Sequence, residues 1–168
     1  DGAELTARRT AAVSGLATRY LAGSGARRLA VVGAGVQARA HIEAMRAVRP
    51  IDDVVVIART SAAALVADLV AEGLSARVGS LADLREADLI CTCTTSATPV
   101  VRGVDIAPGA HVNALDGGGA KRTADATSGT VARSNTSTAT LSAPSRPLKF
   151  KSNTRSTPCT YIASLSSP

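Results

Sequence analysis

Residues spaced for phosphate binding stand between two apolar segments near the start of the chain. Residues 28–32 lead into Gly33-Ala34-Gly35-Val36-Gln37-Ala38, a Gly-x-Gly-x-x-Ala spacing that passes directly into a helical pattern. In a strand–turn–helix unit that binds a dinucleotide, Gly33 allows the tight turn, Gly35 lets a pyrophosphate approach the backbone, and Ala38 packs the helix onto the sheet. The first N–H groups of the helix then face the phosphates. The alternative is a plain strand-to-helix turn that binds nothing.

A second candidate position follows the next apolar run, residues 53–58. Arg59 and Thr60 stand where an NAD-binding unit carries an acid that accepts hydrogen bonds from the ribose 2′-hydroxyl. An arginine suits a 2′-phosphate instead, so the sequence favours NADP(H) as the cofactor, with NAD(H) as the second option. The alternative is an exposed arginine at a strand end.

Two further groups of residues could contact a ligand. Thr94, Thr95 and Ser96 follow the apolar run 88–92, and ligands of open α/β sheets lie outside the carboxyl ends of the strands. A Ser/Thr-rich capping loop explains these three residues equally well. Arg9, on the first predicted helix, could hold a substrate carboxylate with its planar guanidinium, although adjacent arginines on a helix are more often solvated.

The cysteines and histidines indicate neither a metal site nor a disulfide framework. Cys91 and Cys93 are two residues apart on a predicted strand, so they point to one face and are expected in the core, and Cys159 is distant in sequence. His41 and His111 are isolated from each other and from any acidic cluster. We therefore expect both histidines to be structural or surface residues.

The elements that position these residues alternate between strand and helix. Helical periodicity predicts helices over 6–21, 36–48 and 61–72, the last with Ser61 as N-cap and Gly73 as its end. The first helix is expected to present one apolar face, made of Val13, Leu16, Ala17, Tyr20 and Leu21. Apolar runs predict strands at 28–32, 53–58, 76–78, 88–92 and 110–115, with a helical turn at 81–86. This alternation predicts an α/β fold with a doubly wound parallel sheet.

Composition separates this region from the end of the chain. Hydrophobic residues make up 45% and aromatic residues 2%, which suits a parallel sheet with a Val, Leu, Ile and Ala core. The formal charge of +6 lies almost wholly after Gly119, so no nucleic-acid partner is expected for the folded part. No long apolar run or leader pattern occurs, which predicts no membrane partner and a reducing, cytoplasmic setting. Residues 119–168 are rich in Ser and Thr and are expected to form a disordered, low-complexity tail.

Four motifs occur together along the first 115 residues. They are Leu5-Thr6 with Arg9-Thr10-Ala11-Ala12, then Gly33-Ala34-Gly35-Val36-Gln37 with His41, then Thr94-Thr95-Ser96 with Pro99, and Gly109-Ala110-His111-Val112-Asn113-Ala114. This combination resembles the ornithine cyclodeaminase/mu-crystallin family. The resemblance implies a Rossmann NAD(P)-binding domain over residues 25–118. It also implies that residues 1–24 belong to, or link to, a separate substrate and dimerisation domain.

The resemblance also implies a role for each candidate residue. Arg9 matches the arginine that holds the substrate carboxylate. The cofactor diphosphate is met by Gly33, Gly35, Val36 and Gln37, its adenosine side by Arg59 and Thr60, and its nicotinamide end is approached by Thr94, Thr95 and Ser96. The implied reaction is hydride transfer between the nicotinamide and the Cα of a small amino acid or cyclic imine. Cyclodeaminases, imine reductases and alanine dehydrogenases of the family act as homodimers.

Two departures from the family pattern shape the expected function. The chain as given begins just before the Arg-Thr-Ala-Ala helix, without the family's active-site lysine and second substrate-binding arginine. Asp116, the counterpart of the proposed acid–base aspartate, is out of register, and a shifted reading frame after Ala114 would explain the change in composition. We therefore expect impaired turnover. The alternatives are a nucleotide-binding module without turnover, as in a crystallin, and a non-functional gene fragment.

Overall fold

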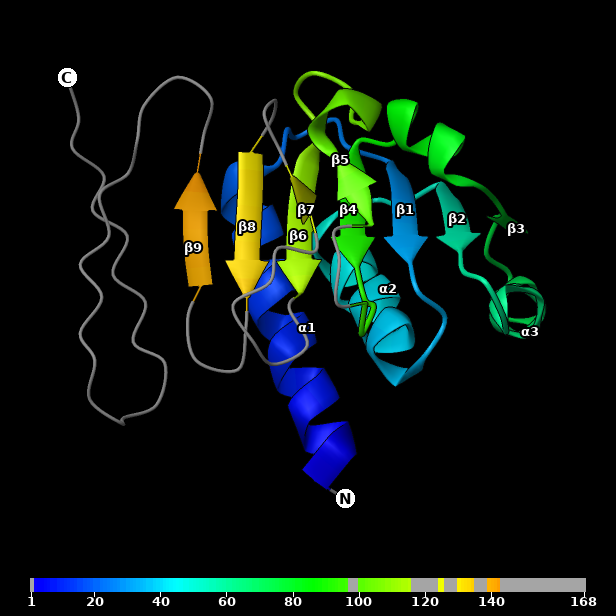
Figure 1. The fold of residues 1–168 in the computed structure, drawn as a ribbon. Helices are drawn as coiled ribbons and strands as arrows, with labels where there is room; N and C mark the ends of the chain where they lie inside the picture. The colour runs from blue at the N-terminus through cyan, green and yellow to red at the C-terminus, as the bar shows by residue number, and fades with distance from the viewer. Residues whose placement is uncertain (1, 97–99, 116–123, 126–129, 135–138, 143–168) are drawn as a thin grey trace, which may run out of the picture.

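A computed structural model describes residues 2–96, 100–115, 124–125, 130–134 and 139–142 of the chain. Its central feature is a parallel sheet in the order β3-β2-β1-β4-β6, drawn in Figure 1. These strands span Ala76–Val78, Asp53–Ile57, Arg28–Val32, Leu89–Thr92 and His111–Leu115. The chain moves outward from β1 in one direction and restarts on its other side with β4, so the topology switches between these two strands. The predicted α/β class with a doubly wound parallel sheet is confirmed.

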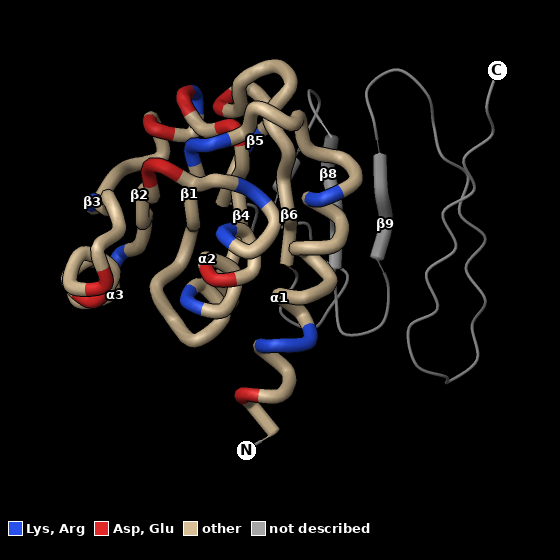
Figure 2. The backbone as a smooth tube through the Cα atoms, turned by 180° about the vertical axis from the view of Figure 1, so that it is seen from behind, with Lys and Arg blue, Asp and Glu red and all other residues tan. Residues whose placement is uncertain are grey.

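Three helices cover one face of this sheet, as the view from behind shows (Figure 2). They are α1 (Gly2–Leu21), α2 (Val36–Val48) and α3 (Ala62–Ala71). Strand residues alternate between the two faces: Leu29 and Val31 pack with the α2 and α3 side chains Ile42 and Leu69. This alternation is the period-two pattern of a strand that is buried on both sides.

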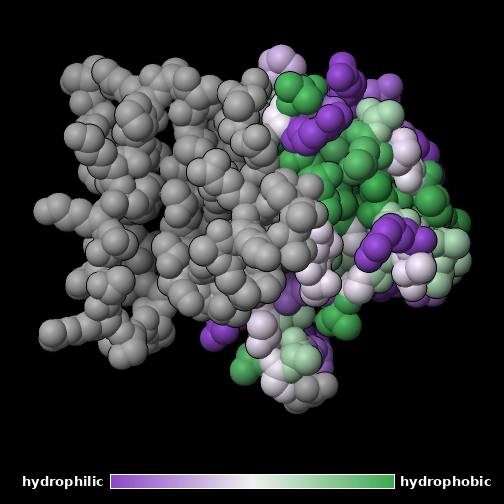
Figure 3. Space-filling model, in the orientation of Figure 1, coloured by the Kyte–Doolittle hydropathy of each residue, from purple (hydrophilic) through white to green (hydrophobic). Residues whose placement is uncertain are grey.

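The opposite face carries shorter elements. Two 3₁₀ segments, η1 (Leu81–Arg85) and η2 (Gly103–Asp105), lie there with β5 (Val101–Arg102), and Leu84 and Ile106 pack against Ala30. Figure 3 shows apolar surface gathered over the described part of this face. The residues of η1 and η2 therefore cover it less completely than the helices cover the other face.

Helix α1 buries small residues in place of the large ones expected from the sequence. Its buried residues are Ala7, Ala11, Ser14, Gly15 and Thr18. The predicted apolar face is wrong in two places, since Leu16 is 46% and Tyr20 is 75% exposed. The reason is close helix packing: a Cβ at Gly15 would lie 3.5 Å from the Ala44 Cβ on α2.

The ends of α3 agree only in part with the sequence prediction. Gly73 has a φ of +83°, and its N–H donates to the Val70 carbonyl while the Leu74 N–H donates to the Leu69 carbonyl. This is the Schellman arrangement that glycine favours, so the predicted helix end is confirmed. Ser61 precedes the helix as predicted, but it has a φ of 64° and its side chain makes no capping hydrogen bond.

The segment 119–168 differs from the expected tail at three short strands. They are β7 (Ala124–Asp125), β8 (Thr130–Ser134) and β9 (Ala139–Ser142). Strand β8 pairs in parallel with β6, and β9 pairs antiparallel with β8. β-Branched residues such as Thr130 and Val131 favour an extended backbone, which the low-complexity composition does not reveal. Within the described residues, no helix combines the length and apolarity that a membrane span needs.

Candidate dinucleotide site at the carboxyl ends of the strands

Gly33 forms the tight turn that leaves β1. Its φ is +126°, and a Cβ at this position would lie 2.2 Å from the Cys93 carbonyl oxygen. The Gly33 N–H donates to the Ile57 carbonyl at 2.8 Å, and the Cys93 N–H donates to the Val32 carbonyl at 2.7 Å. These bonds hold the carboxyl ends of β1, β2 and β4 together around a residue that has no side chain. Only glycine fits both the backbone conformation and the close contact.

Gly35 leaves open space beside the start of α2. No heavy atom lies within 4 Å of the position that a Gly35 Cβ would occupy, and Gly35 brings no side-chain cap to the helix. The first helical hydrogen bond runs from the Arg39 N–H to the Gly35 carbonyl, at 3.2 Å. The N–H groups of residues 36–38 therefore precede the helical hydrogen-bond ladder and lie at the positive end of the helix dipole. Space and donors together suit an anionic group such as a diphosphate.

Gln37 adds a polar atom that the described part of the chain leaves unpaired. Its Oε1 is buried and has no hydrogen-bond partner among the described residues. Its backbone carbonyl, by contrast, lies 2.7 Å from His41 Nδ1. Buried polar atoms are nearly always paired, so an orphaned acceptor two residues after Gly35 fits a site that is completed by a bound group.

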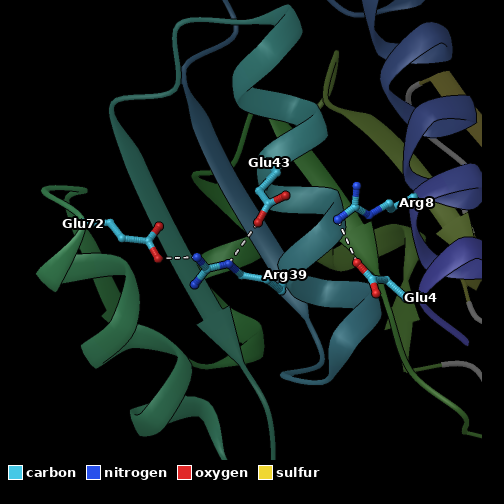
Figure 4. Close-up of polar contacts among 5 residues, drawn as sticks. All are labelled: Glu4, Arg8, Arg39, Glu43 and Glu72. Atoms are coloured by element: carbon cyan, nitrogen blue, oxygen red, sulfur yellow. Dashed lines mark hydrogen bonds and ion pairs between the residues drawn. The ribbon is translucent and has the colours of Figure 1, made fainter. Parts of the chain in front are cut away.

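Arg59 and Thr60 are exposed directly after the carboxyl end of β2. No described residue forms an ion pair with Arg59. Arg39, by contrast, is engaged: Figure 4 shows it between Glu43 and Glu72, which joins α2 to α3. The positive charge of Arg59 is thus available at the edge where the sequence predicts the adenosine side.

The hydroxyl-bearing residues after β4 lie at the same edge of the sheet. The Ser96 N–H donates to Thr94 Oγ1 at 3.1 Å, which closes a local turn, and Thr95 is exposed. The structure thus places Thr94–Ser96 beside the turn at Gly33, because Cys93 contacts both segments. The next residues, 97–99, lie outside the described part of the chain.

Arg9 is not brought into contact with the other predicted residues. It is exposed on α1, on the side opposite the buried residues Ala7, Ala11 and Thr18. The first turns of α1 extend past the carboxyl ends of the strands (Figure 1), and on them Arg8 pairs with Glu4 at 2.7 Å (Figure 4). Arg9 therefore lies beyond the edge that carries the dinucleotide candidates. Asp116 lies outside the described residues.

A set of polar contacts that the sequence did not predict fixes α1 to the sheet domain. The Arg49 guanidinium donates to the carbonyls of Thr18 at 3.0 Å, Ala22 at 2.9 Å and Gly23 at 3.3 Å, which caps the last turn of α1. Asn113 Nδ2 on β6 donates to Thr18 Oγ1 at 2.9 Å. The available signal was an arginine at the C-cap of α2, and its partners are about 30 residues away in the sequence.

The two histidines and Cys91 have structural surroundings, and Cys159 lies outside the described residues. His41 Nε2 lies 3.0 Å from Ser14 Oγ, and His111 Nε2 lies 3.3 Å from Asn113 Oδ1. Burial lowers the pKa of His41, and burial lowers the pKa of His111 to about 4, so both rings are neutral near pH 7. Burial raises the pKa of Cys91 to about 12, which makes it a poor nucleophile. Within the described residues, no group of three or more His, Cys, Asp or Glu side chains could hold a metal ion.

A separate hollow of about 540 Å³ lies on the less covered face of the sheet. Its lining residues are Leu81, Ala82, Arg85, Val100, Arg102 and Asp105. Arg102 is already paired with Asp105 at 2.8 Å. The hollow contains none of the residues that the sequence predicts for the site.

A parallel sheet with a glycine turn at its topological switch point, open at Gly35, defines a Rossmann-type α/β domain. Comparison with known proteins gives its family. The model of the ornithine cyclodeaminase/mu-crystallin family matches residues 1–128, and the chain belongs to this family.

Individual relatives include reductases and a dehydrogenase. The Δ1-pyrroline-2-carboxylate reductase of Bacillus cereus is 39% identical over 120 residues, which are 68% of this chain and 37% of that protein. The Thermococcus litoralis enzyme of the same name, solved with NADH and L-proline, gives a TM-score of 0.62 at 33% identity over 64% of this chain and 35% of that one. An archaeal alanine dehydrogenase dimer with bound NAD gives a TM-score of 0.63 at 32% identity, covering 66% and 36%. The chain thus spans little more than a third of the length of these proteins.

Proposed function

We propose that this chain forms the dinucleotide-binding part of an NAD(P)-dependent enzyme that moves a hydride at the Cα of a small amino acid or cyclic imine. The observation that carries the proposal is the open carboxyl edge, where Gly35 leaves space and the N-terminus of α2 presents unpaired donors. The nicotinamide supplies the hydride chemistry when it is bound, and the residues of this chain bind and orient it. The family and the named reductases support the substrate class.

The cofactor we propose is NADP(H) rather than NAD(H). Arg59 is exposed and unpaired among the described residues at the end of β2, and no acid follows the strand to accept bonds from a ribose 2′-hydroxyl. A guanidinium can instead hold a 2′-phosphate through charge-assisted, bidentate hydrogen bonds. The hydroxyls of Thr60 and Ser61 stand next to it in the sequence.

For the substrate, we propose that Arg9 holds the carboxylate. Its planar guanidinium suits bidentate binding, and no described residue competes for it. Because Arg9 lies beyond the dinucleotide edge on α1, a substrate held there would approach the nicotinamide end from the side of β6. Asp116 stays our candidate for the proton-transfer role. The active form we expect is a homodimer.

Nucleotide titration tests the binding half of this proposal. Binding is followed by the change in fluorescence of the reduced nucleotide. We expect the dissociation constant of NADPH to be about ten- to a hundredfold lower than that of NADH, the ratio that corresponds to a contact of about 1.5–3 kcal/mol. Arg59→Ala should erase the preference and leave NADH binding unchanged. Arg46→Ala removes an exposed arginine at the far end of α2 and should preserve the preference. Tighter NADH binding would refute the NADP assignment, and absence of binding by either nucleotide would refute the dinucleotide site.

Turnover assays separate an enzyme from a binding module. The nicotinamide absorbance is followed with alanine and a cyclic imine as substrates, each with the matching oxidised or reduced cofactor. With ornithine, proline is measured directly, because cyclodeamination regenerates the oxidised cofactor and leaves no net change in absorbance. Hydride transfer to the imine supports the reductase reaction, and proline formation from ornithine supports the cyclodeaminase reaction. Cofactor binding without either reaction favours the module without turnover.

A further inference from the structure

Helix α2 presents one side to α1 and β6 and another side to α3. Its contacts show on which of these sides Gln37 lies. Residues 37, 41 and 45 are four apart, so they share one side of the helix. His41 contacts Ser14 on α1 at 3.0 Å, and Met45 Sδ accepts from Thr18 at 3.2 Å and lies 3.7 Å from Asn113 Nδ2 on β6. Gln37 therefore lies on the side of α2 that faces α1 and β6.

The other side of α2 faces α3. Arg39 binds Glu72 at the end of α3 (Figure 4), and Arg59 stands in the turn that leads from β2 into α3. The strand order β2-β1-β4-β6 then sets the course of a bound dinucleotide. If the adenosine end of the dinucleotide lies at Arg59 and its diphosphate lies at the start of α2, its nicotinamide half must cross β4 toward β6. Gln37 is on that side.

The unpaired atom of Gln37 limits what it can bind. Oε1 is an acceptor, and a diphosphate also presents only acceptors, so the two do not form a hydrogen bond. The partner must carry a donor, and the nicotinamide-side ribose carries two hydroxyls. We propose that Gln37 Oε1 accepts a hydrogen bond from a hydroxyl of the nicotinamide-side ribose. This assignment rests on the proposed function and differs from a side-chain contact to the diphosphate.

The proposal gives Gln37 a different task from its neighbours in the same turn. The N–H groups of residues 36–38 serve the diphosphate through the backbone, whatever their side chains. The Gln37 side chain instead distinguishes a ligand that continues past the diphosphate from one that ends there. ADP and ADP-ribose differ in this respect, because only ADP-ribose has the second ribose.

Gln37→Met tests the proposal, because it keeps the length of the side chain and removes its acceptor. We measure calorimetric affinities of ADP, ADP-ribose and NADH for the unmodified chain and the variant. We expect ADP-ribose and NADH to bind about tenfold more weakly to the variant, the loss that one hydrogen bond explains, with ADP unchanged. The melting temperature of the nucleotide-free variant should not fall, because the acceptor that is removed has no partner there.

Three outcomes overturn this assignment alone. An equal loss for ADP and ADP-ribose would mean that the amide acts at the diphosphate or the adenosine half. No loss for any ligand would mean that Oε1 has no role in binding. A lower melting temperature of the nucleotide-free variant would mean that the amide is already engaged within the protein. Failure of the unmodified chain to bind ADP, ADP-ribose and NADH would refute the proposed function as well, which distinguishes the two failures.

Discussion

The two ends of the parallel strands differ in how completely their polar groups are paired. At the amino ends, Asp88 Oδ2 accepts from the N–H groups of Arg27 and Arg28, each at 2.9 Å, and the Arg27 guanidinium binds Asp52 at 2.9 Å. At the carboxyl ends, Gln37 Oε1 and the Arg59 guanidinium have no hydrogen-bond or ion-pair partner among the described residues. The groups named at the first end are paired within the chain, whereas the second end leaves polar groups that a ligand can satisfy.

One buried polar atom at the amino ends also lacks a partner among the described residues. His111 Nδ1 is also buried without a partner among the described residues, but His111 is only 1% exposed. No ligand can reach this atom without opening the core, so leaving it unpaired only lowers the free energy of unfolding. The unpaired atom of Gln37 instead belongs to the first turn of α2, two residues after Gly35, where a Cβ would meet no other atom within 4 Å. We therefore interpret an unpaired polar group as part of a binding site only where its own turn of the chain also contains open space.

The largest expected effect comes from Gly33→Val. A valine Cβ would overlap the Cys93 carbonyl and would require a φ of +126°, so we expect a loss of about 4 kcal/mol or more in the free energy of unfolding. Urea unfolding followed by circular dichroism measures it. Gly73→Ala is the matched control, because its φ is +83° but no atom lies near, and it should cost about 1–2 kcal/mol. Equal losses for the two variants would show that the contact with Cys93 is unimportant.

Lowering the pH should reduce the free energy of unfolding, because His111 becomes protonated. Burial lowers its pKa to about 4, below the ordinary value near 6.5, so the unfolded chain binds a proton at a pH where the folded chain does not. The contribution of His111 is fully present above pH 6.5 and is lost as the pH falls toward 4, by about 3 kcal/mol in all. Unfolding free energies between pH 7 and pH 4 measure this slope. His111→Gln should flatten it, and an unchanged slope in this variant would assign the acid sensitivity to other groups.

Gly35→Val should break the open end without affecting the closed one. The added side chain would fill the space beside the first N–H groups of α2, so we expect nucleotide affinity to fall at least about a hundredfold. The backbone at Gly35 has a φ of −91°, which valine adopts, and the unfolding free energy should stay nearly constant. A folded variant with unchanged affinity would move the cofactor away from this turn.

Local patterns in the sequence were sufficient to predict the elements around the site. The strand at 28–32 and the helix at 36–48 have the bounds predicted from their apolar periodicity. The turn at Gly33 was also predictable, because the requirement for glycine arises from the local backbone and the next strand. These features depend on residues that are close in sequence, or on the regular geometry of a parallel sheet.

Features that depend on distant contacts could not be predicted in this way. The buried face of α1 consists of small residues because α2 approaches it closely at Ala44, and helical periodicity alone favours the larger Leu16 and Tyr20. The capping of α1 by Arg49 requires the three-dimensional arrangement of two helices. The unpaired state of Gln37 Oε1 likewise becomes visible only when its surroundings are in place.

The smallest expected effect comes from Asp88→Asn, which weakens the closed end. Burial alone would raise the pKa of Asp88, but the N–H groups of Arg27 and Arg28, with the Arg28 charge, hold it below its usual value. An asparagine oxygen still accepts one of these bonds, so we expect a loss of only about 1 kcal/mol in the unfolding free energy at pH 7. Because the depressed pKa belongs to a carboxyl, this stabilisation disappears as the pH falls below the ordinary value near 3.9, and there the variant and the original chain should converge. Nucleotide affinity at pH 7 should be the same for both, since Asp88 lies at the opposite end of the strands from Gly35. A weaker affinity in the variant would show that the two ends are coupled through the sheet.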